Sequence, residues 1–408
     1  MRVLFCSTGG LGHLQPMRPL AVALRAQGHA VAWATAPDAL GWLADQGMAL
    51  YPAGPAFGPG RLAFRQRHAT ALQVTGEALS AQVFPRLFGA TLAPAMVEGL
   101  CAAVDHWRPD LVVHEPAALA APLVCAQRGL PCVTHEYGLP VPAAYLEDAM
   151  RWFGSWWQRA ELVVPAHGGL YRDLAIGVAP PALAPMPVSL AVPHLRLNPC
   201  APGTRPQRRA ARRARVYLTF GTVFNHHPAL LVAANVAAEL GAEVVVSVGL
   251  DRSPGDMPVH PRVQAKTFVD QASLLPTCDL VVSHGGAGTV LAAVAHGLPQ
   301  LVLPQGADHF RNARALAQAG AALVLAPAEQ TRPRLREAVG HLLTSAVQAD
   351  AAQRLAEEMG RMPSPAAAAI ALERWWVARS PSGKPGHPGG VSAAKTPAST
   401  PAAGSSAR

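Results

Sequence analysis

The chain has 408 residues, of which 50% are hydrophobic and 14% charged, so it can bury two ordinary cores and we expect two domains. Its formal net charge of +9 would suit a nucleic-acid or membrane partner, but the excess is unevenly placed. Six arginines lie within residues 205–215, and the last thirty residues hold basic but no acidic side chains. We interpret both segments as solvated and expect no nucleic-acid partner.

The cysteines and the apolar segments indicate the compartment. Six cysteines without paired spacing are typical of reduced core residues. The first apolar segment is too short for the core of a signal peptide, and no uninterrupted run of about 18 apolar residues is present. We therefore expect a cytoplasmic protein without integral membrane contact, and the sequence leaves a homodimer open.

The N-terminal residues follow a βαβ pattern. Residues 3–6 are apolar, a glycine-rich turn follows, and apolar residues at helical spacing continue to Gly28, before a second strand at 31–35. His13 follows the glycine turn, which places it at the carboxyl edge of the first parallel strand, where ligands of open α/β sheets bind. An imidazole there can accept a hydroxyl proton near neutral pH, and a surface histidine is the alternative.

Two later apolar strands each end in a His-Glu pair. The strand at 111–114 is followed by Glu115, and the strand at 132–134 is followed by His135 and Glu136. Metal binding is one interpretation of such pairs. Neither has the i, i+4 histidine spacing of helical zinc motifs, so we expect no metal.

Aromatic residues in helical segments are candidates for the wall of a ligand-binding cleft. Residues 37–106 contain predicted helices, one of which carries Phe84, and a later helix carries Trp152 and Trp156. Together with His135, these side chains would suit a flat apolar ligand. Packing of helices in a core is the alternative explanation for such aromatic residues.

A change in composition divides the chain. We expect a first domain at 1–200, an Arg- and Pro-rich linker at 201–215, a second domain at 216–363, a helix at 364–378 and a disordered tail at 379–408. Both domains alternate apolar strands with helices. This order predicts an α/β fold.

The longest functional pattern lies at residues 283–312 and reads SHGGAGTVLAAVAHGLPQLVLPQGADHFRN. A strand ends at His284, a glycine turn follows, and a helix continues from Thr289. Such a junction offers unpaired backbone N–H groups and the positive end of a helix dipole to a phosphate. Similar turns without a ligand occur in other doubly wound domains. Here a second strand brings Asp308 and His309 to the same edge, where they suit sugar hydroxyls.

This pattern resembles the donor-binding signature of the inverting, UDP-glycosyltransferase-like family with the GT-B fold, in particular of bacterial transferases that decorate natural products. The resemblance implies two Rossmann-like doubly wound domains facing a central cleft, with the C-terminal helix crossing back to the first domain. By the same resemblance, His13 is the general base on the acceptor hydroxyl and Glu115, where Asp is commoner, orients the imidazole.

The resemblance also implies the donor-binding residues. Relatives place the diphosphate at the glycine turn and at a hydroxyl after the second domain's first strand, the sugar at the Asp-His pair, and the base at an aromatic side chain and a backbone edge. The corresponding residues are Thr222, Phe268, Val269, His284, Gly285, Gly286, Gly288, Thr289, Asp308 and His309. Relatives usually carry Pro where Asp270 stands and Gln where His309 stands.

The implied function is transfer of a sugar, with inversion, from a dTDP- or UDP-linked donor to a hydroxyl of a small, largely apolar acceptor. The donor is then a co-substrate, and no cofactor or metal is expected. The alternatives are a lipid-linked sugar transferase or a nucleotide-sugar epimerase on the same fold, or a catalytically silent partner of a transferase. An epimerase would convert the donor without a second substrate, and a silent partner would not bind the donor tightly.

Overall fold

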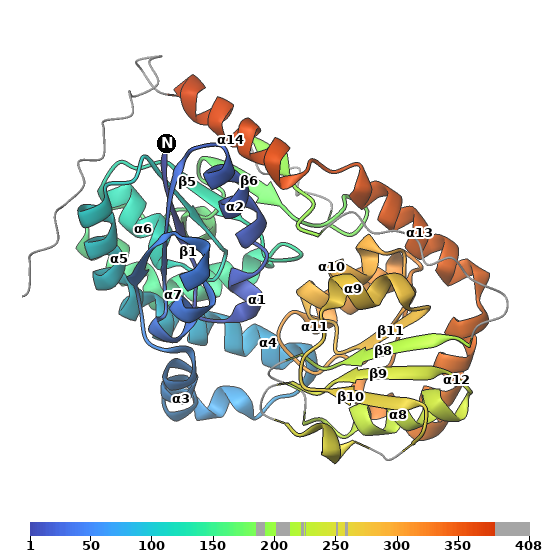
Figure 1. Cartoon of the computed structure of the whole chain (residues 1–408). Coiled ribbons are helices and arrows are strands. Elements are labelled where there is room, and N and C mark those ends of the chain that lie inside the picture. The colour runs from blue at the N-terminus through green and yellow to red at the C-terminus, as the bar shows by residue number, and fades with distance from the viewer. Residues whose placement is uncertain are drawn as a thin grey trace, which may run out of the picture.

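Two parallel β-sheets with their helices form two α/β domains (Figure 1). The computed structural model describes residues 1–184, 192–200, 213–221, 224, 226–249, 252–257 and 260–379. Every strand pair that it describes in the two sheets is parallel. Parallel neighbours need crossover connections, usually helical, that cover the faces of the sheet. The prediction of two doubly wound domains is therefore confirmed.

The first domain is built on a seven-stranded sheet in the order β3-β2-β1-β4-β5-β6-β7. The central strands are buried on both faces, which is why they are apolar without alternation; in β1, residues 3–6 have no exposed surface. The strands are β1 (Arg2–Cys6), β2 (Ala30–Thr35), β3 (Ala49–Pro52), β4 (Leu111–His114), β5 (Cys132–His135), β6 (Leu174–Gly177) and β7 (His194–Arg196).

Helices and short helical turns connect these strands. The helices are α1 (Leu11–Leu14), α2 (Arg18–Ala26), α3 (Phe57–Arg67), α4 (Gly76–Phe84), the π-helix η4 (Pro85–Leu92), α5 (Ala93–Trp107), α6 (Ala120–Gln127) and α7 (Ala143–Arg159). The 3-10 turns are η1 (Pro37–Trp42), η2 (Ala44–Gln46), η3 (Ala69–Leu72) and η5 (Ala166–Gly169).

The helices α4, η4 and α5 run on as one apolar stretch, Gly76–Trp107. Its length and composition would allow it to cross a bilayer, but 56% of its most apolar window is buried inside the protein. Burial of this kind is typical of a core helix in a folded domain. The π-helical turn begins at Pro85, which has no N–H to donate to the preceding turn.

The second domain is built on a six-stranded sheet in the order β10-β9-β8-β11-β12-β13. Its strands are β8 (Arg215–Thr219), β9 (Glu243–Ser247), β10 (Val263–Lys266), β11 (Leu280–Ser283), β12 (Gln300–Val302) and β13 (Ala322–Val324). Its helices are α8 (Ala229–Glu239), α9 (Gln271–Leu274), α10 (Ala287–Ala295), α11 (His309–Gln318), α12 (Arg332–Thr344) and α13 (Ala346–Gly360), with 3-10 turns η6 (Pro254–Asp256), η7 (Leu275–Thr277) and η8 (Pro327–Glu329).

The last helix, α14 (Pro365–Arg379), returns to the first domain and packs on α2, as expected (Figure 1). Gln27 Nε2 donates a hydrogen bond of 2.8 Å to the carbonyl of Ala366, and Leu372 is fully buried. Trp375 and Trp376 are partly buried against the same core. Of the predicted linker and tail, residues 201–212 and 380–408 lie outside the described residues, and β8 begins at the last residue assigned to the linker.

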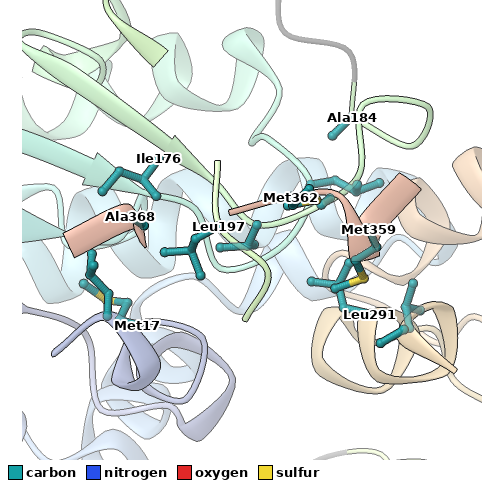
Figure 2. Packing of buried hydrophobic residues seen from close by; sticks show 14 of the residues in the cluster. Met17, Ile176, Ala184, Leu197, Leu291, Met359, Met362 and Ala368 are labelled. Atoms are coloured by element: carbon teal, nitrogen blue, oxygen red, sulfur yellow. The ribbon is translucent and has the colours of Figure 1, made fainter. Parts of the chain in front are cut away.

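One apolar cluster continues from the first domain into the second where α13 meets α14. Figure 2 shows Leu197 and Met362 at this junction, with Met359 of α13 beside Leu291 of α10. The residue after Leu197 donates its backbone N–H to the carbonyl of Pro363 at 2.9 Å. The chain leaving the first domain and the chain returning to it therefore pack together on this side of the molecule.

Candidate functional site

The carboxyl ends of β1 and β4 bring His13 and Glu115 together. The two strands are parallel neighbours with Cys6 opposite His114, so the residues that follow them meet at one edge of the sheet. His13 lies in α1, and its Nδ1 is 3.2 Å from Oε2 of Glu115. Nε2 is then the ring nitrogen available to a substrate.

Glu115 is fully buried and held by the surrounding backbone. Its Oε1 accepts hydrogen bonds from the N–H of Thr8 (3.0 Å) and the hydroxyl of Thr8 (3.1 Å), and its Oε2 accepts one from the N–H of Ala117 (2.5 Å). Burial alone would raise the pKa of Glu115, but His13 and these N–H groups hold it below its ordinary value. The carboxylate is therefore charged at neutral pH.

The same pair makes His13 a stronger base. Burial disfavours the imidazolium, yet the charge of Glu115, with a contribution from Asp308, raises the pKa of His13 above its ordinary value of 6.5. A Cβ on Gly10 would lie 2.9 Å from the His13 ring, so a larger residue at position 10 would clash with the imidazole. The ring centroids of Tyr137 and Phe88 lie 4.7 and 5.4 Å from that of His13. His13, the candidate general base, is thus surrounded by aromatic side chains.

The N-terminus of α10 forms an open turn in the second domain. Gly286 is the N-cap, and the N–H groups of Gly286, Gly288 and Thr289 have no hydrogen-bond partner within the described residues. Gly285 has a left-handed φ of 92°, and a Cβ there would lie 2.7 Å from Val302. A Cβ on Gly288 would meet nothing within 4 Å. The turn can therefore accept an anion at the positive end of the helix.

Two neutral histidines lie beside this turn. The rings of His284 and His309 are perpendicular, with centroids 4.3 Å apart. Burial, together with the neighbouring His309, lowers the pKa of His284 to about 3, and burial lowers the pKa of His309 to about 3. Nδ1 of His309 accepts a hydrogen bond from the N–H of Gly306 at 3.1 Å, so we assign the hydrogen to Nε2. At neutral pH this ring can donate a hydrogen bond without carrying charge.

Asp308 is tied to the same helix end. Its Oδ2 accepts hydrogen bonds from the N–H of Ala287 (3.1 Å) and from Nδ2 of Asn312 (2.7 Å), and Asn312 also donates to the carbonyl of Gly285 (2.8 Å). Ala307, the residue before it, has a left-handed φ of 49°, a strained conformation for a residue with a Cβ. The structure therefore places the Asp-His pair directly beside the open turn of α10.

The segment proposed to bind a base lies at the same sheet edge. Phe268 follows β10 and is 73% exposed, and Val269 is partly buried against the apolar cluster that contains Tyr217. Asp270 is the N-cap of α9, where its side chain accepts from the N–H of Ala272 at 3.1 Å. Asp and Pro both favour helix starts, which explains the exchange at this position. β10 is three strands from β11, about 14 Å at the usual strand spacing, a distance that an extended nucleoside diphosphate can span.

The predicted acceptor residues occupy different environments. Phe84 is buried, and its ring centroid lies 5.0 Å from that of Phe88, which contacts His13. Trp152 is 44% exposed and Trp156 is half-buried. Phe84 therefore contacts His13 indirectly, through Phe88, whereas Trp152 lies near the surface.

Two further predicted residues complete the set. His135 is fully buried, its Nδ1 donates to the carbonyl of Glu136 at 2.7 Å, and burial lowers its pKa to about 4. Thr222 lies outside the described residues. Across the part of the chain that the structure describes, no three His, Cys, Asp or Glu side chains gather in a way that could hold a metal ion.

The two sheet edges face each other. The charge of Asp308 in the second domain acts on His13 in the first, and a Cβ on Gly138 would lie 2.5 Å from that of Ala287 at the start of α10. The sequence predicted that the two domains face each other, but it did not predict the approach of Gly138 to Ala287 and gave no role to Tyr137 beside His13. A polar residue directly after a buried strand, as at Glu136, is the signal that could have drawn attention to the segment.

Two family models match the chain. The erythromycin biosynthesis protein CIII-like N-terminal domain matches residues 22–192, and the corresponding C-terminal domain matches residues 231–374. The chain belongs to this EryCIII-like family of glycosyltransferases. The predicted resemblance to natural-product glycosyltransferases is confirmed.

Two curated relatives, both glycosyltransferases, match this EryCIII-like protein over nearly all of their own length. The L-demethylnoviosyl transferase of Streptomyces niveus is 33% identical over 383 residues, which cover 91% of this chain and 97% of the relative. The elloramycin glycosyltransferase ElmGT of Streptomyces olivaceus is 35% identical over 400 residues, with the same two shares.

Solved structures resemble the EryCIII-like protein over nearly all of its length. The spinosyn rhamnosyltransferase SpnG in complex with thymidine diphosphate is 27% identical, with a TM-score of 0.73 over 91% of this chain and 100% of SpnG. SsfS6 of Streptomyces sp. SF2575, also in complex with thymidine diphosphate, is 26% identical, with a TM-score of 0.72 over 92% of this chain and 99% of SsfS6. The expected GT-B fold is confirmed, and the protein is a glycosyltransferase.

Proposed function

We propose that this EryCIII-like protein transfers a sugar from a thymidine diphosphate sugar to a hydroxyl of a small, largely apolar acceptor such as a natural-product aglycone, with inversion and without a metal, in the cytoplasm. One observation carries the proposal: the charged Glu115 raises the pKa of His13 at one sheet edge, and the open turn of α10 faces it from the other domain.

Solved structures of relatives support the class of donor, and the aromatic side chains around His13 support the class of acceptor. SsfS6 and SpnG have been solved with thymidine diphosphate, and SpnG has also been solved with spinosyn aglycone. In the present chain, Phe88, Phe84 and Tyr137 surround His13 with aromatic surface. An apolar acceptor would bury that surface while its hydroxyl reaches Nε2.

The reaction can then be written in one displacement. Nε2 of His13 accepts the proton of the acceptor hydroxyl as its oxygen forms a bond to the anomeric carbon, and the bond from that carbon to the diphosphate oxygen breaks on the opposite face. The negative charge that develops on the leaving diphosphate meets the free N–H groups of Gly286, Gly288 and Thr289. Glu115 stabilises the imidazolium in the manner of a catalytic triad.

A screen with two variables tests the proposal. The purified protein is incubated with thymidine and uridine diphosphate sugars and a panel of hydroxylated aromatic polyketides, and glycoside and free nucleotide diphosphate are measured by mass spectrometry. We expect glycoside and thymidine diphosphate in equal amounts. Conversion of the donor without an acceptor would favour an epimerase, and absence of thymidine diphosphate binding in calorimetry would favour a silent partner.

Replacing the base separates chemistry from binding. His13→Ala is expected to lower kcat by about two to four orders of magnitude, the usual contribution of a general base. The affinity for thymidine diphosphate, measured by calorimetry, should stay within about twofold, because the diphosphate is bound by the other domain. The control is His341→Ala, which changes an exposed histidine of α12 and should leave both quantities unchanged. Turnover retained in His13→Ala would remove His13 from the mechanism.

A further inference from the structure

Glu136 is a buried carboxyl group that the proposed reaction does not use. It follows β5 directly and has no exposed surface. Its Oε1 accepts a hydrogen bond from the hydroxyl of Tyr171, and its Oε2 has no hydrogen-bond partner within the described residues. Tyr171 has a left-handed φ of 58°, which is strained for a bulky side chain. The fold therefore retains a strained residue that fixes one oxygen of Glu136 and leaves the other free to bind.

Arg311 of α11, in the second domain, lies near enough for its charge to act on this carboxyl group. Its Nε and Nη2 are buried and, in the part of the chain that the structure describes, have no hydrogen-bond partner. Burial raises the pKa of Glu136 to about 7, while the hydrogen bond from Tyr171 and the charge of Arg311 act in the opposite direction. Among the described residues, neither Oε2 of Glu136 nor these two nitrogens of Arg311 has a hydrogen-bond partner, so the two groups are not hydrogen-bonded to each other through these atoms. The two groups are close enough to interact but do not satisfy each other.

These groups lie on the acceptor side of the proposed reaction. The charge of Arg311 acts on Glu136, Tyr137 and Tyr171, all of which belong to the first domain. The ring of Tyr137 is 4.7 Å from that of His13. Donors and acceptors that are buried without partners are costly, so proteins rarely keep them unless a ligand completes them.

We propose that Glu136 and Arg311 form a polar subsite for a second oxygen-bearing group of the acceptor, one near the hydroxyl that is glycosylated. The guanidinium, which can only donate, binds the oxygen, and Oε2 of Glu136 takes the hydrogen of that hydroxyl. This inference rests on the proposed function. It narrows the acceptor class from apolar alcohols to compounds with at least two neighbouring oxygen groups on an apolar frame.

The test compares two probes on two arginine variants. The probes are 1,2-dihydroxyanthraquinone and 2-hydroxyanthraquinone, planar compounds that differ by one hydroxyl, and their binding is measured by fluorescence in the presence of thymidine diphosphate. The variants are Arg311→Met and, as matched control, Arg314→Met, which removes an exposed arginine of the same helix that pairs with Glu77. Arg311 is partly buried and its charge acts on the buried Glu136, so its removal is expected to cost some stability. The melting temperature of each variant therefore shows whether it is folded under the conditions of the binding measurement.

We expect the wild type and Arg314→Met to bind the dihydroxy probe at least about tenfold more tightly than the monohydroxy probe, the effect of one charge-assisted hydrogen bond. In Arg311→Met the two affinities should become equal, and Glu136→Gln should reduce the difference. Equal binding of the two probes by the wild type, or binding of neither, overturns the subsite. A tenfold loss of thymidine diphosphate affinity in Arg311→Met also overturns it, because Arg311 would then serve the donor. Failure of the proposed function would show separately, as wild-type protein that does not bind thymidine diphosphate.

Discussion

Glu115 acts on His13 through its charge, which gives a prediction at the scale of single residues. Glu115 raises the pKa of His13, and the imidazole is an active base only when it is neutral. In Glu115→Gln the pKa of His13 falls, so the acid limb of the profile of kcat/KM against pH moves to lower pH. The plateau should fall by about two orders of magnitude or more, since the imidazolium loses its counter-charge.

The matched variant is Glu115→Asp, which keeps the charge on a side chain one methylene shorter. It should restore the position of the acid limb and much of the rate. A Glu115→Gln profile whose acid limb stays at the wild-type pH would show that the carboxylate does not act on the base.

His284 and His309 make the stability of the second domain depend on pH. Their folded-state pKa values of about 3 lie below the ordinary 6.5, so the unfolded chain binds more protons between these values. Stability is then present above pH 6.5 and is lost as the pH falls. From pH 6.5 to 5 the loss is about 2 kcal/mol for each histidine, at about 1.36 kcal/mol per pKa unit.

His309→Gln tests this dependence with the residue that relatives commonly carry. The Gln carbonyl can accept the hydrogen bond that Nδ1 of His309 receives from Gly306. Urea-unfolding midpoints measured near pH 7 and near pH 5 should differ by less than in the wild type, because one of the groups that binds a proton on unfolding is gone. An unchanged difference would contradict the assignment of His309 as a neutral buried ring.

Candidate site residues could be named from the sequence more readily than the contacts between them. Sequence motifs are local, so His13, His284 and Asp308 could be named from neighbouring glycines and from strand ends. The contact of Asp308 with the N–H of Ala287, and the approach of Arg311 to Glu136, join segments that no local pattern relates. The first contact depends on which strands are neighbours in the second sheet, and the second on how the two domains are placed. A single sequence encodes neither in a readable form.

At the scale of elements, α10 gives the clearest prediction. Its first turn is open at Gly288, where an added Cβ would meet no atom within 4 Å outside the helix's own backbone. Gly288→Asp therefore leaves the fold intact but places a negative charge where the diphosphate is proposed to bind. We expect the affinity for thymidine diphosphate to fall at least about tenfold, the effect of a like charge at a partly solvated site.

The matched control is Gly340→Asp, because Gly340 of α12 is also helical and has an equally open Cβ position. It should leave the affinity unchanged. Equal affinities in Gly288→Asp and the wild type, measured by calorimetry, would place the diphosphate away from α10.

Strands were predicted correctly where burial on both faces of the sheet gives an uninterrupted apolar run in the sequence. The central strands β1 and β4 are fully buried apart from Arg2 and were predicted within one residue of their bounds. The edge strand β3 was missed, because its residues are only partly buried and it ends in Pro52, a residue typical of loops. β6 and β7 were missed as well. Short strands near the sheet edge have too few apolar residues to show a period.

At the scale of the whole molecule, the two domains are joined on one side and face each other on the other. The cluster around Leu197 and Met362 connects them through α13 and α14, and the sites lie at the facing sheet edges. The proposed reaction needs this geometry, because the donor and the acceptor would be bound by different domains and would react only when the domains bring them together. The distance between the domains is therefore part of the proposed mechanism.

Gly138 and Ala287 set that distance at one point of contact. A Cβ on Gly138 would lie 2.5 Å from the Cβ of Ala287 and 3.8 Å from its Cα. Gly138→Ala must move the domains apart by about 1 Å to reach ordinary contact, and a misplacement of about 1 Å can cost about 10²-fold in rate. We expect kcat to fall by about that factor while the affinity for thymidine diphosphate, which the second domain binds, stays unchanged.

The contact itself supplies the control. In the double variant Gly138→Ala, Ala287→Gly the clashing methyl group is removed, and the nearest remaining atom of residue 287 lies at an ordinary 3.8 Å. The double variant should recover most of the wild-type kcat, and Ala287→Gly alone should lose little, since the substitution lies at the first position of α10. If the double variant is as slow as Gly138→Ala, the loss comes from the backbone at residue 138 and not from the spacing of the domains.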